Sequence, residues 1–134
     1  MIVPDSSAWI ELFRETRSPT DLALTHLLDE RAAIGTTEVI IFELLAGARS
    51  PQNLSELRSQ FLGFEVLTLD GMNDYEAAAE LYRTCRASGE TIRDLRDCLI
   101  AVPVIRAGAD LLHNDADFDA IARHSDLRIY RGGN

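Results

Sequence analysis

Residues 1–13 read MIVPDSSAWIELF, and this stretch decides the fold. An apolar strand begins at Ile2 and ends at Asp5. Ser6 or Ser7 can cap a helix, because the apolar residues that follow recur at helical spacing. A strand that leads directly into a helix is typical of a βαβ unit. The opening of the chain therefore predicts an α/β fold.

The same alternation continues along the chain. Further strands are expected at residues 32–35, 64–69, 109–113 and 127–130, and helices at 22–28, 38–48, 54–62, 75–87, 95–106 and 116–123. This order favours a mainly parallel sheet covered by helices on both faces. We expect one domain that spans residues 1–134. Ligands of such sheets bind beyond the carboxyl ends of the strands, where Asp5 and Asn114–Asp115 lie.

Composition excludes several classes of protein. Hydrophobic residues make up 46% of the chain and charged residues 26%, as in ordinary soluble domains. The two cysteines, Cys85 and Cys98, have no metal-binding spacing, which argues against a disulfide scaffold and a zinc site. No basic segment precedes an apolar stretch near residue 1, and no apolar run approaches the ~20 residues of a membrane span. We expect a cytoplasmic protein.

The charge balance leaves nucleic acid open as a partner. The formal net charge is −9, whereas nucleic-acid binders usually carry a basic surface. All 13 basic residues are arginine, whose planar guanidinium suits phosphate or carboxylate. Acidic residues that bind a cation would also change the local field. Charge alone therefore decides nothing.

Glu43 and Asp97 lie in helical segments where their neighbours one turn away are apolar or small. Acidic side chains are rarely buried unless they are paired. Arg93 lies four residues before Asp97 and could pair with it. Each acid could equally be a partly exposed residue at the edge of a helix.

Asp5 and Asp115 each stand just before a predicted helix. An aspartate there can cap the helix, which stabilises it by ~1 kcal/mol, or it can be a metal ligand. Asp117 and Asp119 fall in the first turn after Asp115, where the helix dipole favours negative charge. Taken singly, Asp5 and Asp115 are explained by either role.

Taken together, Asp5, Glu43, Asp97 and Asp115 indicate a metal site more strongly than any of them does alone. If the helices of Glu43 and Asp97 flank the edge where Asp5 and Asp115 emerge, the carboxylates converge. Two carboxylates ~4 Å apart repel by roughly 4 kcal/mol at an effective dielectric constant near 20. Such a cluster requires a hard divalent cation, Mg²⁺ or Mn²⁺. A cation held this way can activate water for attack on phosphorus.

Four segments, in order, resemble the motifs of PIN-domain ribonucleases. They are DSSAWI at 5–10, ELLAG at 43–47, DCLIA at 97–101 and HNDADF at 113–118. Their spacing is usual for that family and covers essentially the whole chain. The compact length is most similar to that of VapC toxins from VapBC toxin–antitoxin pairs.

This resemblance implies a three-layer α/β/α sandwich and an Mg²⁺- or Mn²⁺-dependent endoribonuclease. It implies that structured RNA such as tRNA or rRNA is cut, that the toxin forms a homodimer, and that a cognate VapB-like antitoxin blocks it. The implied metal and catalytic residues are Asp5, Glu43, Asp97 and Asp115, with Asp117 as a candidate fifth acid and Ser7 supporting Asp5. Candidate RNA contacts are Arg14, Arg93 and Arg96, with Arg17 and Arg49, although a solvated face explains these arginines equally well.

Two prolines depart from the family pattern. Pro4 precedes the first aspartate and removes a backbone donor. Pro103 falls inside the helix of Asp97, where a proline usually kinks the helix at a cost near 3 kcal/mol. Because Pro103 lies beyond Asp97, we expect the acid to keep its place.

Two other functions remain as alternatives. A metal-dependent phosphatase or a phospho-acceptor domain also has an aspartate after its first strand. The phosphatase usually needs a second nearby aspartate and a later lysine, and this chain has no lysine. A degenerate PIN domain would bind RNA or protein without cutting. The histidines are expected to be structural, because His26, His113 and His124 share no metal-binding spacing.

Overall fold

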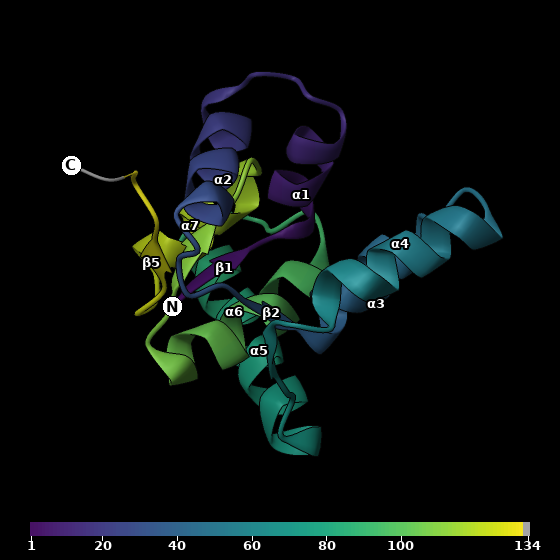
Figure 1. Ribbon diagram of the computed structural model, residues 1–134. Helices are drawn as coiled ribbons and strands as arrows, with labels where there is room; N and C mark the ends of the chain where they lie inside the picture. The colour runs from purple at the N-terminus through teal and green to yellow at the C-terminus, as the bar shows by residue number, and fades with distance from the viewer. Residues whose placement is uncertain (133–134) are drawn as a thin grey trace.

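The computed structural model describes residues 1–132 (Figure 1). Helices and strands alternate in the order β1 Ile2–Pro4, α1 Ser6–Phe13, α2 Pro19–Asp29, β2 Gly35–Thr37, α3 Glu38–Ala46, α4 Pro51–Phe61, β3 Glu65–Leu67, α5 Gly71–Ala87, α6 Leu95–Ala107, β4 Asp110–Leu112, α7 Ala116–Arg123 and β5 Arg128–Ile129. Within residues 1–132, none of these helices has the length and apolar character needed to cross a membrane.

Every strand pairing is parallel. β1 pairs with β4, placing Ile2 opposite Asp110, and β4 pairs with β5. On the other side β2 pairs with β3, and a bridge between Ile2 and Ile34 joins β2 to β1. The strand order is therefore β3-β2-β1-β4-β5. The chain first moves outward from β1 to β3 and then returns to the other side of β1, so the connections reverse between β1 and β4. Ligands of open α/β sheets bind at such a point.

Helices cover both faces of the sheet. α1 and α2 pack together on one face, and α5 and α6 lie on the other (Figure 1). α7 packs against α5 and α6, while α3 and α4 form a hairpin that projects to one side. Trp9, Ile100, Leu111 and Phe118 are fully buried between these layers. The predicted α/β/α sandwich with a parallel sheet is confirmed.

Two of the helices that begin earlier than the sequence predicts start at a proline. α2 begins at Pro19 and α4 at Pro51, each directly after a serine. The hydroxyls of Ser18 and Ser50 accept backbone N–H groups three residues on, at 3.1 and 3.0 Å. Proline suits the first turn, where its missing N–H is not needed. Both Ser–Pro pairs are helix starts.

α6 continues through Pro103 to Ala107 as one helix. The side chain of Pro103 is buried in the core. Asp97 lies in the first turn, N-terminal to the carbonyl that the proline leaves without a partner. The acid therefore keeps its helical setting, as expected.

Candidate metal centre

The carboxyl ends of β1 and β4 carry the acids that were predicted to converge. Asp5 directly follows β1, and Asp115 lies in the loop after β4. α6 contributes Asp97 and α7 contributes Asp117. One carboxylate oxygen from each of Asp97, Asp115 and Asp117 lies within 4.8 Å of the other two. The structure thus brings three acids from two helices and a loop into one cluster.

Asp5 is both a helix cap and a candidate ligand. Its Oδ2 accepts hydrogen bonds from the Ser7 backbone N–H at 3.0 Å and from Ser7 Oγ at 2.7 Å. Asp5 is therefore the N-cap of α1, and the expectation that Ser6 or Ser7 caps it is wrong. Its Oδ1 is buried and has no hydrogen-bond partner. One oxygen holds the helix, and the other remains for a ligand.

The environment of Asp5 favours its protonated form when no cation is bound. The residue is 4% exposed, and burial raises the pKa of Asp5 to about 6. This pKa is the net result of burial, which raises it most, of the hydrogen bonds from Ser7, which lower it, and of the nearby charge of Glu43, which raises it. Ser7 Oγ also accepts the Asn114 backbone N–H at 2.9 Å. This hydroxyl supports Asp5, as expected, and ties it to the loop that carries Asp115.

Asp97 is buried among like charges. It is 4% exposed, and its Oδ2 has no hydrogen-bond partner. Burial raises the pKa of Asp97 far above its ordinary value, and the charges of Asp5 and Asp115 raise it further. A carboxylate in this position is stabilised only by a cation or a proton.

Arg93 pairs with the acids of the loop and of α7. Its Nη2 lies 3.4 Å from Asp115 Oδ1, and its Nε lies 3.4 Å from Asp117 Oδ1. The backbone N–H groups of Arg93 and Asp94 donate to Asp117 Oδ2 at 3.1 and 3.3 Å. The suggested Arg93–Asp97 pair is therefore wrong. Asp117 instead anchors the segment that leads into α6.

Glu43 lies beside the three-acid cluster. Its Oε1 accepts a hydrogen bond from Ser6 Oγ at 2.6 Å, and its Oε2 lies 3.5 Å from Arg96 Nε. Arg96 also pairs with Asp94 at 2.8 Å. The sequence indicated Ser6 only as a candidate helix cap. Its position next to Asp5 is the signal that could have indicated its contact with an acid of the site. Glu43 is held from both sides next to Asp5.

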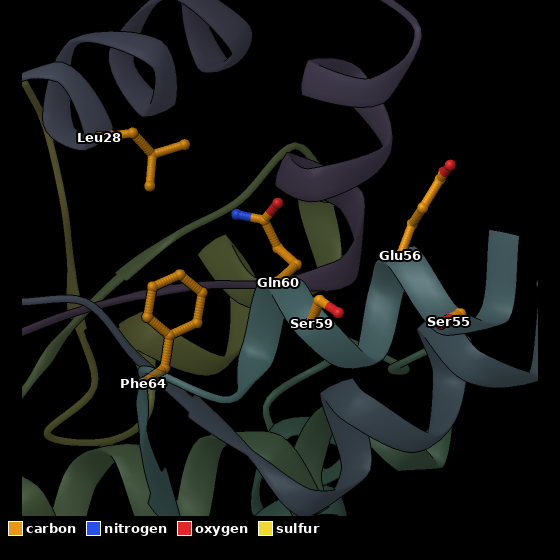
Figure 2. A pocket seen from close by; sticks show the side chains of 6 residues that line it. All are labelled: Leu28, Ser55, Glu56, Ser59, Gln60 and Phe64. Carbon is orange, nitrogen blue, oxygen red and sulfur yellow. The ribbon is translucent and has the colours of Figure 1, made fainter. Parts of the chain in front are cut away.

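A groove begins at Glu43 and runs between α1, α3 and α4. It has a volume of about 660 Å³, and Arg14 and Arg49 are among its lining residues. A separate hollow of about 560 Å³ lies against α4 on the side of Leu28 and Phe64 (Figure 2). That hollow contains none of the five acids predicted for the site.

The residues of the cluster fit a hard divalent cation. They offer carboxylate oxygens and no nitrogen or sulfur ligand, which is the donor set of Mg²⁺ and Mn²⁺. Asp97 Oδ2 in the cluster and Asp5 Oδ1 outside it are both buried and have no hydrogen-bond partner. Bound positive charge would satisfy both atoms and relieve the repulsion that raises the pKa of Asp97.

Comparisons with known proteins agree with this site. The profile of the PIN domain matches residues 2–124. The chain is 44% identical over 129 residues to "Ribonuclease VapC11" of Mycobacterium tuberculosis (strain ATCC 25618 / H37Rv), covering 96% of both chains. It belongs to the VapC ribonucleases of the PIN-domain family.

Solved VapC-family structures share the fold. The toxin–antitoxin structure VapBC-1 from nontypeable Haemophilus influenzae has a chain that matches with a TM-score of 0.74 at 19% identity, covering 97% of both chains. VapC20 of M. tuberculosis, described as a sarcin–ricin loop cleaving toxin, matches with a TM-score of 0.65 at 15% identity, covering 96% of this chain and 99% of that one. At these identities the likeness concerns the fold.

The raised pKa values predict that the metal-free PIN domain loses stability as the pH rises. The unfolded chain releases the Asp5 proton near pH 4, whereas the folded chain keeps it until about pH 6. The folded state therefore binds more protons between these values, and stability falls as the pH rises through them. Between pH 5 and 7.5 we expect Asp5 alone to cost roughly 1 kcal/mol.

Urea unfolding in excess chelator at both pH values measures this loss. Asp5→Asn should make the pH dependence shallower, because position 5 then has no carboxyl to titrate, while the raised pKa of Asp97 still contributes to the slope. Glu90 does not obscure the result: Arg123 and His124 lower its pKa to about 2, so its stabilising charge is lost only below this range. An equal slope in the variant and the wild type would contradict the assignment.

Proposed function

We propose that this VapC-family chain is an Mg²⁺- or Mn²⁺-dependent endoribonuclease toxin that cuts structured RNA. The observation that carries the proposal is the cluster of Asp97, Asp115 and Asp117 within 4.8 Å of one another, next to Asp5. The similarity to a VapC ribonuclease supports RNA as the substrate. The sarcin–ricin loop named for the fold neighbour VapC20 is a structured RNA, which supports tRNA or rRNA as the target class.

Asp5, Asp97 and Asp115 are the proposed principal ligands, and Glu43 and Asp117 complete the acidic site. A divalent ion held by these residues would supply an activated water and would neutralise charge on the phosphate. Ser7 keeps Asp5 Oδ1 free by engaging Oδ2. Arg14, Arg93 and Arg96 are exposed, and the latter two lie against the acids, which supports them as contacts for RNA phosphates.

Cleavage of RNA by antitoxin-free protein tests this proposal. Purified chain is incubated with tRNA and rRNA in Mg²⁺, in Mn²⁺ and in excess chelator. We expect cuts at defined positions with either metal and none with chelator, because the site offers no other group to activate water. Undiminished cleavage in chelator would contradict a metal mechanism. Folded protein that binds RNA with metal and never cuts it would indicate a degenerate PIN domain.

We also propose that a cognate VapB-like antitoxin neutralises the chain. We further propose that the chain is a single domain, that it forms a homodimer and that it acts in the cytoplasm. Structural neighbours such as VapBC-1 are toxin–antitoxin complexes, which supports this partner. Expression of the chain alone should arrest growth, and co-expression of the small protein encoded beside it should restore growth. Light scattering of the purified complex should show two copies of the toxin. A monomer at micromolar concentration, with no growth defect on expression, would contradict both the homodimer and the toxin–antitoxin pairing.

A further inference from the structure

His113 lies in the loop between β4 and Asp115, and its ring contacts the backbone of that loop. The side chain is only 8% exposed and packs against Phe118, with ring centroids 5.4 Å apart. Nδ1 accepts a hydrogen bond from the Asp115 backbone N–H at 3.0 Å. On the opposite side of the ring, Nε2 lies 3.3 Å from Asp119 Oδ1.

The hydrogen bond from the Asp115 N–H selects one tautomer of the imidazole ring. A backbone N–H can only donate, so Nδ1 must present its lone pair to Asp115. The proton then lies on Nε2, which is 3.3 Å from Asp119 Oδ1 but does not form a hydrogen bond with it. The Nδ1–H tautomer would direct two N–H groups at each other across 3.0 Å.

We propose that His113, as the Nε2–H tautomer, is a positioning residue of the metal centre. By accepting the Asp115 N–H it sets the backbone from which the Asp115 carboxylate meets Asp97 and Asp117. The preceding residue is held in the same way, because the Asn114 N–H donates to Ser7 Oγ at 2.9 Å. Two acceptors therefore fix two successive peptides of the loop. The inference rests on the metal centre proposed above.

Two substitutions of His113 separate this role from simple packing. In His113→Asn the amide oxygen can occupy the place of Nδ1 and accept the Asp115 N–H. In His113→Gln the longer side chain brings its amide to the place of Nε2, toward Asp119, and leaves the Asp115 N–H without an acceptor. Both variants lose the imidazole ring and its packing on Phe118.

Calorimetric titration of antitoxin-free protein with Mn²⁺ gives the deciding comparison. We expect His113→Asn to bind within about threefold of wild type and His113→Gln to bind roughly tenfold more weakly, as is usual when a group that orients a ligand is lost. His26→Gln is the control, because His26 is exposed on α2 and should leave Mn²⁺ affinity unchanged. Circular dichroism confirms that each variant is folded.

The wild type provides a second readout that does not depend on the variants folding. Long-range ¹H–¹⁵N spectra of the metal-free protein should show His113 as the Nε2–H tautomer. An Nδ1–H tautomer, or equal weakening of Mn²⁺ binding in the Asn and Gln variants, would overturn the role of His113. Full affinity in a folded His113→Gln would do the same and leave the metal centre intact. A folded wild type that binds no Mn²⁺ would overturn the metal centre, and the role of His113 with it.

Discussion

Replacing Asp97 with asparagine should lower RNA cleavage by roughly a hundredfold or more and leave the metal-free protein at least as stable as the wild type. The substitution keeps the shape of the side chain and removes one charge from the cluster. Because burial and neighbouring acids raise the pKa of Asp97, ionising it destabilises the folded state, and the amide removes that cost. The loss of a ligand weakens the stabilisation of the reacting phosphate.

Single-turnover cleavage and thermal melts, each with chelator and with Mn²⁺ at matched ionic strength, measure both effects. Mn²⁺ should stabilise the wild type by ~2.7 kcal/mol at a hundredfold excess over Kd, and the variant by less. Asp29→Asn is the matched control, since Asp29 is an exposed carboxylate at the end of α2. If Asp97→Asn loses stability without metal yet responds fully to Mn²⁺, Asp97 has no place among the ligands.

Replacing Arg106 with methionine should destabilise the protein by about 2 kcal/mol, because a buried carboxylate then loses its partner. Arg106 Nη1 and Nη2 donate to the two oxygens of Asp74 at 2.7 and 2.8 Å, and Nη2 also donates to the Thr68 carbonyl at 3.1 Å. Asp74 is 3% exposed, and the hydrogen bonds from Arg106 hold its pKa below the ordinary value. The side chain of Arg106 is half-exposed, which keeps the expected loss below that of a fully buried pair.

Urea unfolding at pH 7 gives the free energy difference. Arg128→Met provides the comparison, because Arg128 pairs with Asp110 at the surface and should contribute less than about 1 kcal/mol. Adding Asp74→Asn to Arg106→Met should recover part of the lost stability, since the unpaired charge is gone. If the Arg106 and Arg128 variants lost the same free energy of unfolding, the burial of Asp74 would not increase the contribution of its ion pair to stability.

The order of the helices and strands was predictable, because apolar periodicity reports which faces are buried. The residues at which they begin and end were less predictable. Thr37 is the last residue of β2 and also caps α3, because its hydroxyl accepts the Ile40 N–H at 3.1 Å. The strand therefore ends at Thr37 and not at residue 35, where the sequence predicted its end. Gly71 begins α5 with a φ of +48°, ahead of residue 75, where the sequence predicted the start of this helix.

The approach of Asp5 and Asp115 was predictable, because neighbouring parallel strands end at the same edge of a sheet, whereas the position of Asp97 depends on how α6 packs. The partner of Arg93 was not predictable. The expected pairing with Asp97 rested on a spacing of four residues, but Arg93 lies before the start of α6 at Leu95. The true partners, Asp115 and Asp117, are brought to Arg93 by the docking of α7 onto α6, which no local pattern encodes.

The central place of β1 means that a chain growing on the ribosome cannot complete its sheet in the order of synthesis. Ile2–Pro4 emerges first, but one of its two neighbouring strands, Asp110–Leu112, emerges only after β2, β3 and all the helices between them. Until then the Ser7 hydroxyl has no Asn114 N–H to accept, and Asp97 has no Asp115 beside it. An incompletely synthesised chain has no complete acid cluster. The metal centre can therefore form only after β4 and α7 have docked.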